Sequence, residues 1–336
     1  MNTRTAVFPD SSQDKLITRR LLIYLGVTFA ISWLWEFLVV WPAANGESTW
    51  IPSSLTSYAV AVVMFVPALS VLITRLVTKE GFKNCWIVPK DFKKTWWLWL
   101  AAWFGPAVLT LLGSLLYFLI FPGQYDSSLG YFQIIMMFSG YSLDTDALRN
   151  LIWIQITVAA LLGPLINILT CFGEEWGWRG YLLPKMSLKL KTLPMLLVNG
   201  VIWGIWHAPM TALGHNYGTG YWGFPWTGIL MMCGFCIVFG TLFSYVTLKT
   251  GSCIPAAFAH GGLNSIASAG IYFTTSGGNA FVGPAVTGII GGLPALILAG
   301  FLAWRMMKQT EADDEIIISI EEKARFTENK PEQKEA

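Results

Sequence analysis

Charged residues are scarce in this sequence, and cysteine and histidine are scarcer still. Lys, Arg, Asp and Glu make up 12% of the 336 residues, whereas 54% are hydrophobic and the mean hydropathy is +0.54. This composition excludes an ordinary soluble domain, in which charged residues make up about 25%. The five cysteines give no disulfide framework, because at least three of them lie in apolar stretches. We find no soluble domain and no internal repeat, and we expect no nucleic-acid partner.

Long apolar runs predict an all-α polytopic membrane protein. Windows of about 20 mainly apolar residues are long enough to cross a bilayer as helices. The first run lacks a small-residue cleavage site at its end, so no cleavable signal peptide is expected. We predict about eight transmembrane helices: Leu21–Trp41, Leu55–Leu76, Trp96–Phe121, Leu151–Phe172 with a continuation to Met186, Leu193–Met210, Trp226–Leu248, Ile254–Phe273 and Pro284–Met307.

Basic residues predict the orientation of these helices. All 22 Lys and Arg residues except Arg149 fall towards one side of the eight-helix arrangement, and such residues favour the cytoplasm. We expect a multi-pass protein of the cell membrane with both termini inside, and the short loops favour a prokaryotic plasma membrane. The predicted parts are a cytoplasmic segment 1–20, a transmembrane domain 21–308 with its core at about 150–273, and a cytoplasmic tail 309–336.

The stretch Gly173–Gly180 places two adjacent acids and an arginine after a long apolar run. A charge inside a bilayer costs at least about 2.5–3.5 kcal/mol, so intramembrane acids indicate a functional site. On a helix, Glu175 and Arg179 stand at i and i+4 with the acid first, which favours an ion pair. Glu174 is turned about 100° away from that pair, and we expect it to act on a group brought by another helix.

Two further apolar segments each carry a histidine at helical spacing. Trp203 and His207 share a helix face at i and i+4, and so do His260 and Asn264. Glu174 and His260 each lie eleven residues from a lysine, about 16 Å along a helix, which favours a shared cavity open to the cytoplasm. A lone intramembrane histidine is more often a packing residue, but these carboxylate, imidazole and carboxamide groups are chemically complementary.

In this order, the three motifs resemble those of the CAAX-protease and bacteriocin-processing (CPBP, or ABI) family of intramembrane proteases. The family pattern is EExxxR, FxxxH and HxxxN. Here the motifs read Glu174-Glu175-x-x-x-Arg179, Trp203-x-x-x-His207 and His260-x-x-x-Asn264. The resemblance covers roughly residues 155–270 and departs from the usual pattern in having Trp for Phe. It implies an intramembrane endopeptidase, like the type II CAAX prenyl endopeptidases, that acts on a membrane-associated or hydrophobic peptide in the lipid bilayer.

Hydrolysis of a peptide bond requires a base for the water and donors for the developing oxyanion. We assign Glu174 as the base and His207 as the group that orients or deprotonates the water. His260 and Asn264, on one helix face, are expected to bind the oxyanion. The supporting residues are Glu175, Arg179 and Trp203.

Two alternatives stay open. Glu174, His207 and His260 are sufficient for a catalytic zinc with one open position, and the family is often described as metalloproteases. However, nothing here resembles HExxH, so the spacing does not favour a metal. The alternative function on the same fold is a non-catalytic membrane regulator or bacteriocin-immunity protein.

Other polar groups receive structural interpretations. We expect Glu36, in the first apolar run, to reach the outer interface beside an aromatic belt; a role as substrate gate or helix partner is the alternative. Cys233 and Cys236 are expected to pack inside an apolar helix, and His215 to lie at the surface.

Overall fold

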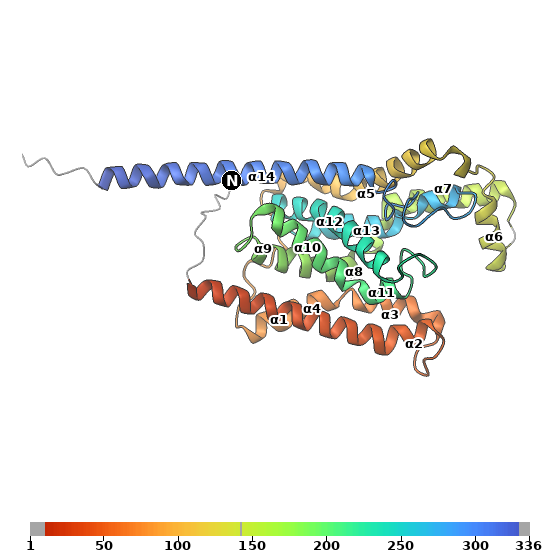
Figure 1. Cartoon of the computed structure of the whole chain (residues 1–336), viewed down its shortest axis with the longest axis horizontal. Coiled ribbons are helices and arrows are strands. Elements are labelled where there is room, and N and C mark those ends of the chain that lie inside the picture. The colour runs from red at the N-terminus through yellow and green to blue at the C-terminus, as the bar shows by residue number, and fades with distance from the viewer. Residues whose placement is uncertain (1–10, 142, 329–336) are drawn as a thin grey trace, which may run out of the picture.

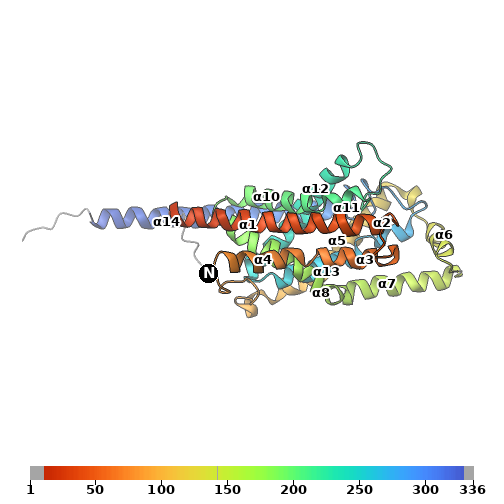
Figure 2. The same cartoon turned by 90° about the horizontal axis from the view of Figure 1, so that it is seen from below.

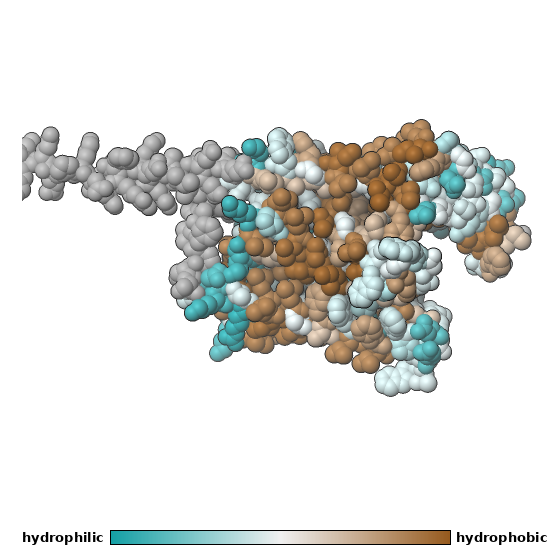
Figure 3. Space-filling model, in the orientation of Figure 1, coloured by the Kyte–Doolittle hydropathy of each residue, from teal (hydrophilic) through white to brown (hydrophobic). Residues whose placement is uncertain are grey.

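The computed structural model describes residues 11–141 and 143–328, with side chains for 12–141 and 143–310. The regular structure of these residues is helical, without a strand, and most helices run along the long axis of the molecule (Figure 1 and Figure 2). A wide apolar band covers the face in Figure 3, with hydrophilic residues at its two ends. Within the described residues, five helical segments are long and apolar enough to cross a membrane. The prediction of an all-α polytopic membrane protein is therefore confirmed, whereas the number of eight spans stays a prediction.

The helices follow one another with mostly short connections. The first half contains α1 (Ser11–Trp35), the π-helical turn η1 (Glu36–Val40), α2 (Trp41–Ala44), η2 (Ser53–Leu55), α3 (Thr56–Val63), α4 (Val66–Val77), α5 (Phe92–Ile120), η3 (Pro122–Gln124), α6 (Gly130–Phe138) and α7 (Thr145–Ile166). The second half contains α8 (Ile168–Gly177), the π-helical turn η4 (Trp178–Leu182), α9 (Leu183–Met186), α10 (Thr192–Trp206), α11 (Ala208–Ala212), α12 (Trp226–Thr250), α13 (Ile254–Ile266), η5 (Ala269–Phe273) and α14 (Leu293–Glu328).

The predicted fourth span is interrupted at Asn167, where α7 ends and α8 begins. Pro164 lacks the N–H that would continue the helical hydrogen bonds. The Asn167 side-chain Nδ2 donates to Ser265 Oγ at 2.8 Å and to Gly261 O at 3.2 Å, both on α13. The interruption therefore ties α8 to the helix that carries His260.

His207 marks a second interruption, because α10 ends at Trp206 and α11 begins at Ala208. Pro209 lies in the first turn of α11 and has no backbone N–H to donate to the preceding turn. The predicted fifth span, Leu193–Met210, is therefore two helices rather than one, and its histidine lies at the break.

The predicted seventh span, Ile254–Phe273, is also shorter as a helix. α13 ends at Ile266, and the 3-10 helix η5 follows after a short turn. A Cβ on Gly270 of η5 would lie 2.3 Å from Ser114 Oγ of α5. In place of the last turns of the expected helix, the chain forms η5, which packs closely against α5.

The predicted eighth span, Pro284–Met307, becomes helical only at Leu293. Before this residue the chain folds back on itself, since a Cβ on Gly291 would lie 2.1 Å from Ala285 O. α14 then continues to Glu328, and Figure 1 shows it extending well beyond the bundle. The part of the predicted tail after this helix lies outside the described residues.

Glu36 does not reach the outer interface, so that expectation is wrong. Its side chain lies in η1 and is 1% exposed, and its Oε2 has no hydrogen-bond partner among the described residues. The preceding turn of α1 is bound to α10, because Trp33 Nε1 donates to Trp206 O at 3.3 Å and Trp206 Nε1 donates to Ser32 Oγ at 2.7 Å. The face of the helix that carries Glu36 therefore lies against protein.

One end of the bundle, which we call the basic end, is held together by Glu80. Its carboxylate accepts hydrogen bonds from Lys185 Nζ at 2.6 Å and Tyr181 Oη at 2.9 Å, and Arg20 Nε lies 3.4 Å away. Burial alone would raise the pKa of Glu80, but the hydrogen bonds from Lys185 and Tyr181 and the charge of Arg75 lower it below its ordinary value. These contacts fix the π-helical turn η4 relative to α1 and α4.

Candidate active site

Two glycines of the acidic motif allow α8 to pack closely against the region where α3 ends and α4 begins. A Cβ on Gly173 would lie 2.6 Å from Met64 O, and one on Gly177 would lie 2.5 Å from Pro67 Cβ. Larger side chains would push the helices apart. The two acids between these glycines are buried as a result.

Glu175 is the centre of the buried charge. Its Oε1 accepts hydrogen bonds from Arg179 Nη1 at 3.0 Å and from His260 Nδ1 at 2.9 Å. The predicted ion pair on one helix face is therefore present, and His260 is a second partner that the sequence did not indicate. Arg179 belongs to the π-helical turn η4, a distortion that is frequent at functional sites.

Glu174 is held by Trp203. The indole Nε1 donates to Glu174 Oε2 at 2.9 Å, while Oε1 accepts no hydrogen bond from a described residue. The face of the same indole covers Arg179, whose guanidinium carbon lies 4.2 Å from the ring centroid. Trp203 thus contacts both parts of the acidic motif, and it supplies an N–H donor that the family's usual phenylalanine lacks.

His207 is half-buried at the junction of α10 and α11. Its Nδ1 lies 2.8 Å from Trp203 O. A carbonyl oxygen only accepts, so we assign the proton to Nδ1, which leaves Nε2 as an acceptor in the neutral ring. The His207 and His260 rings lie 5.7 Å and 5.4 Å from the Trp203 ring, between centroids. Both imidazoles therefore adjoin the residue that holds Glu174.

Asn264 lies apart from this cluster. It is exposed, and its Nδ2 contacts Cys171 Sγ at 3.7 Å. No described hydrogen bond joins it to another predicted site residue. The structure brings together Glu174, Glu175, Arg179, Trp203, His207 and His260.

Three of the clustered groups are held by one polar atom and leave a second atom free. The free atoms are Glu174 Oε1, His207 Nε2 and His260 Nε2, none of which bonds to a described residue. Each side chain adjoins the Trp203 indole. A fixed carboxylate and two fixed imidazoles can take a proton from water and return one to a leaving group.

A catalytic zinc fits this arrangement poorly. Among the side chains described, those of residues 12–141 and 143–310, no group of three or more His, Cys, Asp or Glu is placed to hold a metal ion. We therefore derive no step through a metal.

Two residues of α12 that complete the cluster had no distinctive signal in the sequence. The Phe243 ring stacks on His260 with centroids 5.7 Å apart, and a Cβ on Gly240 would lie 2.9 Å from Arg179 Nη2. A glycine and a phenylalanine are ordinary in an apolar helix, so only packing identifies them. On the same helix both predicted packing cysteines are buried, with free thiols.

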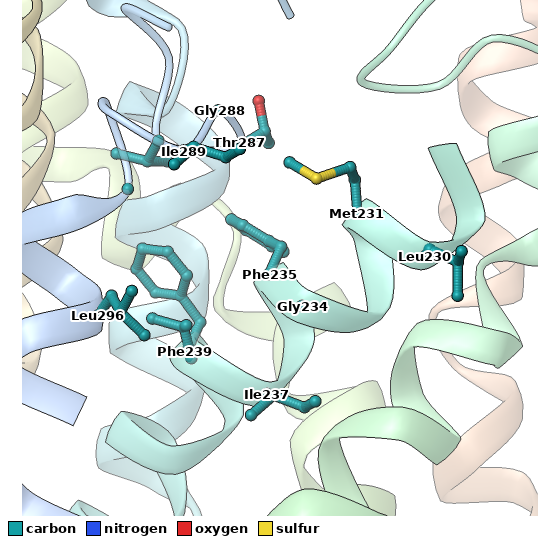
Figure 4. A pocket seen from close by; sticks show the side chains of 13 residues that line it. Leu230, Met231, Gly234, Phe235, Ile237, Phe239, Thr287, Gly288, Ile289 and Leu296 are labelled. Carbon is teal, nitrogen blue, oxygen red and sulfur yellow. The ribbon is translucent and has the colours of Figure 1, made fainter. Parts of the chain in front are cut away.

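Two cavities lie outside this cluster. One, of about 320 Å³, is apolar and lies between α12 and the segment before α14. Figure 4 shows Met231, Phe235 and Phe239 pointing towards Thr287 and Ile289. The other, of about 290 Å³, is lined by the loops that follow α11 and η5. No predicted site residue lines either cavity.

Comparison with known proteins adds one finding to this geometry. Residues 150–266 match the model of a family described as type II CAAX prenyl endopeptidase Rce1-like. The match contains all seven predicted site residues. A search of curated proteins found no match. Over residues 150–266 the chain is therefore similar to the Rce1-like family of type II CAAX prenyl endopeptidases.

Proposed function

We propose that this protein is an intramembrane endopeptidase in which Glu174 activates the water that cleaves a peptide bond. The main support for this proposal is the arrangement of three side chains around Trp203. Glu174, His207 and His260 are each fixed through one polar atom, and each presents a second polar atom beside Trp203. The Rce1-like family match supports the same class of reaction.

The proposed reaction begins with a water hydrogen-bonded to Glu174 Oε1 and His207 Nε2. Glu174 takes a proton from this water as the oxygen attacks the scissile carbonyl carbon. The carbonyl oxygen gains the negative charge of the tetrahedral intermediate. When the C–N bond breaks, the proton held by Glu174 passes to the leaving nitrogen. The mechanism requires only groups of this chain and one water.

His260 is assigned to the developing oxyanion. Its Nδ1 donates to Glu175, so the carboxylate behind the ring stabilises a positive charge on the imidazole. A protonated ring presents Nε2–H as a donor to the oxyanion. Asn264, one helical turn further along α13, is the proposed second donor after a substrate has entered.

The substrate we propose is a membrane-associated or hydrophobic peptide, and the family match supports this proposal. We place the basic end of the bundle on the cytoplasmic side, where Lys and Arg are favoured. Figure 3 supports a lipid-facing surface between two polar ends.

Histidine substitutions test this proposal, because the chain contains only three histidines. His207→Ala and His260→Ala should each lower kcat for peptide cleavage about 100-fold or more, since each removes a group that contacts water or oxyanion. His215→Ala is the matched control, because His215 is exposed in the loop after α11. The measurement is cleavage of a prenylated CAAX peptide by the purified protein in liposomes.

The control variant should retain wild-type kcat within about twofold. If all three variants cleave like wild type, the histidines are not part of the chemistry and the proposal is wrong. Retention of the cellular phenotype in inactive variants would instead support a non-catalytic regulator on the same fold.

A further inference from the structure

Two hydroxyl groups of α12 are buried without a hydrogen bond. Ser244 and Thr247 are 0% exposed, and neither Ser244 Oγ nor Thr247 Oγ1 has a partner among the described residues. A buried polar group without a partner costs about 1–3 kcal/mol. Such groups in a native protein are commonly satisfied by ordered water or a bound ion.

Neighbouring threonines on the same helix behave differently. Thr241 Oγ1 donates to Ile237 O at 2.8 Å, and Thr250 Oγ1 donates to Val246 O at 2.7 Å. This bond to the preceding turn is the usual arrangement for Ser and Thr inside a helix. Ser244 and Thr247 could satisfy their hydroxyls in the same way, but neither hydroxyl makes this bond.

These two hydroxyls lie on the helix face that contacts Arg179. Gly240 marks that face, because a Cβ on it would lie 2.9 Å from Arg179 Nη2. Ser244 and Thr247 follow Gly240 at i+4 and i+7, so they lie on the same face in successive turns. Gly240, Ser244 and Thr247 therefore form a row on α12 that starts beside the buried ion pair and runs towards Lys249 at the basic end.

The ion pair itself has unused hydrogen-bonding groups. Glu175 Oε2, Arg179 Nε and Arg179 Nη2 are buried and have no partner among the described residues. Asn199 Oδ1 on α10 is likewise unpartnered, although its Nδ2 lies 3.4 Å from Trp178 O of η4. We call these atoms and the hydroxyls of Ser244 and Thr247 the polar file.

The chemistry of the polar file identifies its ligand. Arg179 offers donors, Glu175 and Asn199 offer acceptors, and the hydroxyls can do both. An ion would leave half of these groups unsatisfied, whereas water both donates and accepts. Hydroxyls at i and i+3 have Cβ atoms about 5–6 Å apart, a separation that one water can bridge with two hydrogen bonds of about 2.8 Å.

We propose that the polar file is an internal hydration site, in which ordered water connects Ser244 and Thr247 to the Glu175–Arg179 pair. The water satisfies the free atoms of the pair and so keeps Glu175 in place against His260. The use of this water by a hydrolase rests on the proposed function, whereas its presence rests only on the buried polar atoms.

Thermal unfolding tests the hydration site, because removal of a hydrated hydroxyl and removal of a dry hydroxyl change the Tm in different directions. Thr247→Val and Ser244→Ala remove a hydroxyl with little change in volume. If each hydroxyl holds water, the Tm should fall by about 2–4 °C, since a buried water loses a partner. If a hydroxyl is dry and unpaired, its removal should leave the Tm unchanged or raise it, which would overturn the proposal.

Two further variants separate hydration from packing. Thr247→Ser keeps the hydroxyl and should keep a higher Tm than Thr247→Val. Thr241→Val, whose hydroxyl bonds to its own helix, should change the Tm less than Thr247→Val does. Equal Tm values for Thr247→Ser and Thr247→Val would also overturn the proposal.

An electron density map of the full chain in a nanodisc gives the direct test. We expect a water peak within hydrogen-bond distance of both Ser244 Oγ and Thr247 Oγ1. A well-resolved map without such a peak would contradict the hydration site. Neither measurement depends on cleavage, so the result is independent of whether the proposed function is correct.

Discussion

E174Q is expected to cleave peptide substrate about a thousandfold more slowly than wild type. The amide keeps the size of the side chain and can still accept the hydrogen bond from Trp203, but it cannot take a proton from water. General-base catalysis typically contributes 10²–10⁴-fold to the rate, and Glu174 is the proposed base. The measurement is kcat for a prenylated CAAX peptide with the purified protein in liposomes.

The matched control is E47Q, which changes an exposed glutamate in the loop after α2. This variant should retain wild-type activity, and both variants should retain a wild-type Tm within about 2 °C. An E174Q protein that folds normally and still cleaves at more than a tenth of the wild-type rate would exclude Glu174 as the base.

R179M is expected to lower the free energy of unfolding by about 3–5 kcal/mol. Removing one partner of a buried ion pair leaves the other charge uncompensated, which causes a loss of this size. Arg179 and Glu175 are both fully buried, and Arg179 also covers Trp203. The measurement is denaturant unfolding of the purified protein in detergent or lipid.

The exposed pair of Arg149 and Asp146 provides the control. Its two atoms are 2.8 Å apart, but its side chains are 46% and 86% exposed. Exposed ion pairs contribute about 0–1 kcal/mol, so R149M should change stability by less than about 1 kcal/mol. Similar losses in R179M and R149M would contradict the role assigned to the buried pair.

The ion pair of Glu175 and Arg179 could be predicted from the sequence because it depends on local helix geometry. A spacing of i and i+4 brings two side chains together on any helix. The bond between Glu175 and His260 joins residues 85 positions apart, so it depends on how α8 and α13 pack. Spacing along the chain carries no information about such a contact.

The membrane class was predictable because it follows from average composition over long windows. The same averaging hid the interruptions at Asn167 and His207, since a proline changes a hydropathy window very little while it removes a backbone hydrogen bond. Leu293 begins the last helix late for a related reason, because the preceding glycines allow a close fold of the chain. Helix breaks near polar residues can therefore be located only in the structure.

Glu36 shows a third limit of the sequence. A carboxylate near tryptophans at the end of an apolar run is typical of an interfacial residue. The π-helical turn η1 and the contacts of Ser32 and Trp33 with Trp206 bury it instead. Its environment is set by the packing of α1 on α10, which no local pattern in α1 indicates.

The proposed mechanism requires Glu174, His207 and His260 to act together on one peptide bond. An experimental structure of E174Q with a bound peptide substrate would show whether they do. We expect the scissile carbonyl beside Trp203, with the position-174 side chain and His207 Nε2 on the attacking side and His260 Nε2 within hydrogen-bond distance of the carbonyl oxygen. A peptide whose cleavable bond lies beyond hydrogen-bond or single-water reach of all three side chains would contradict it.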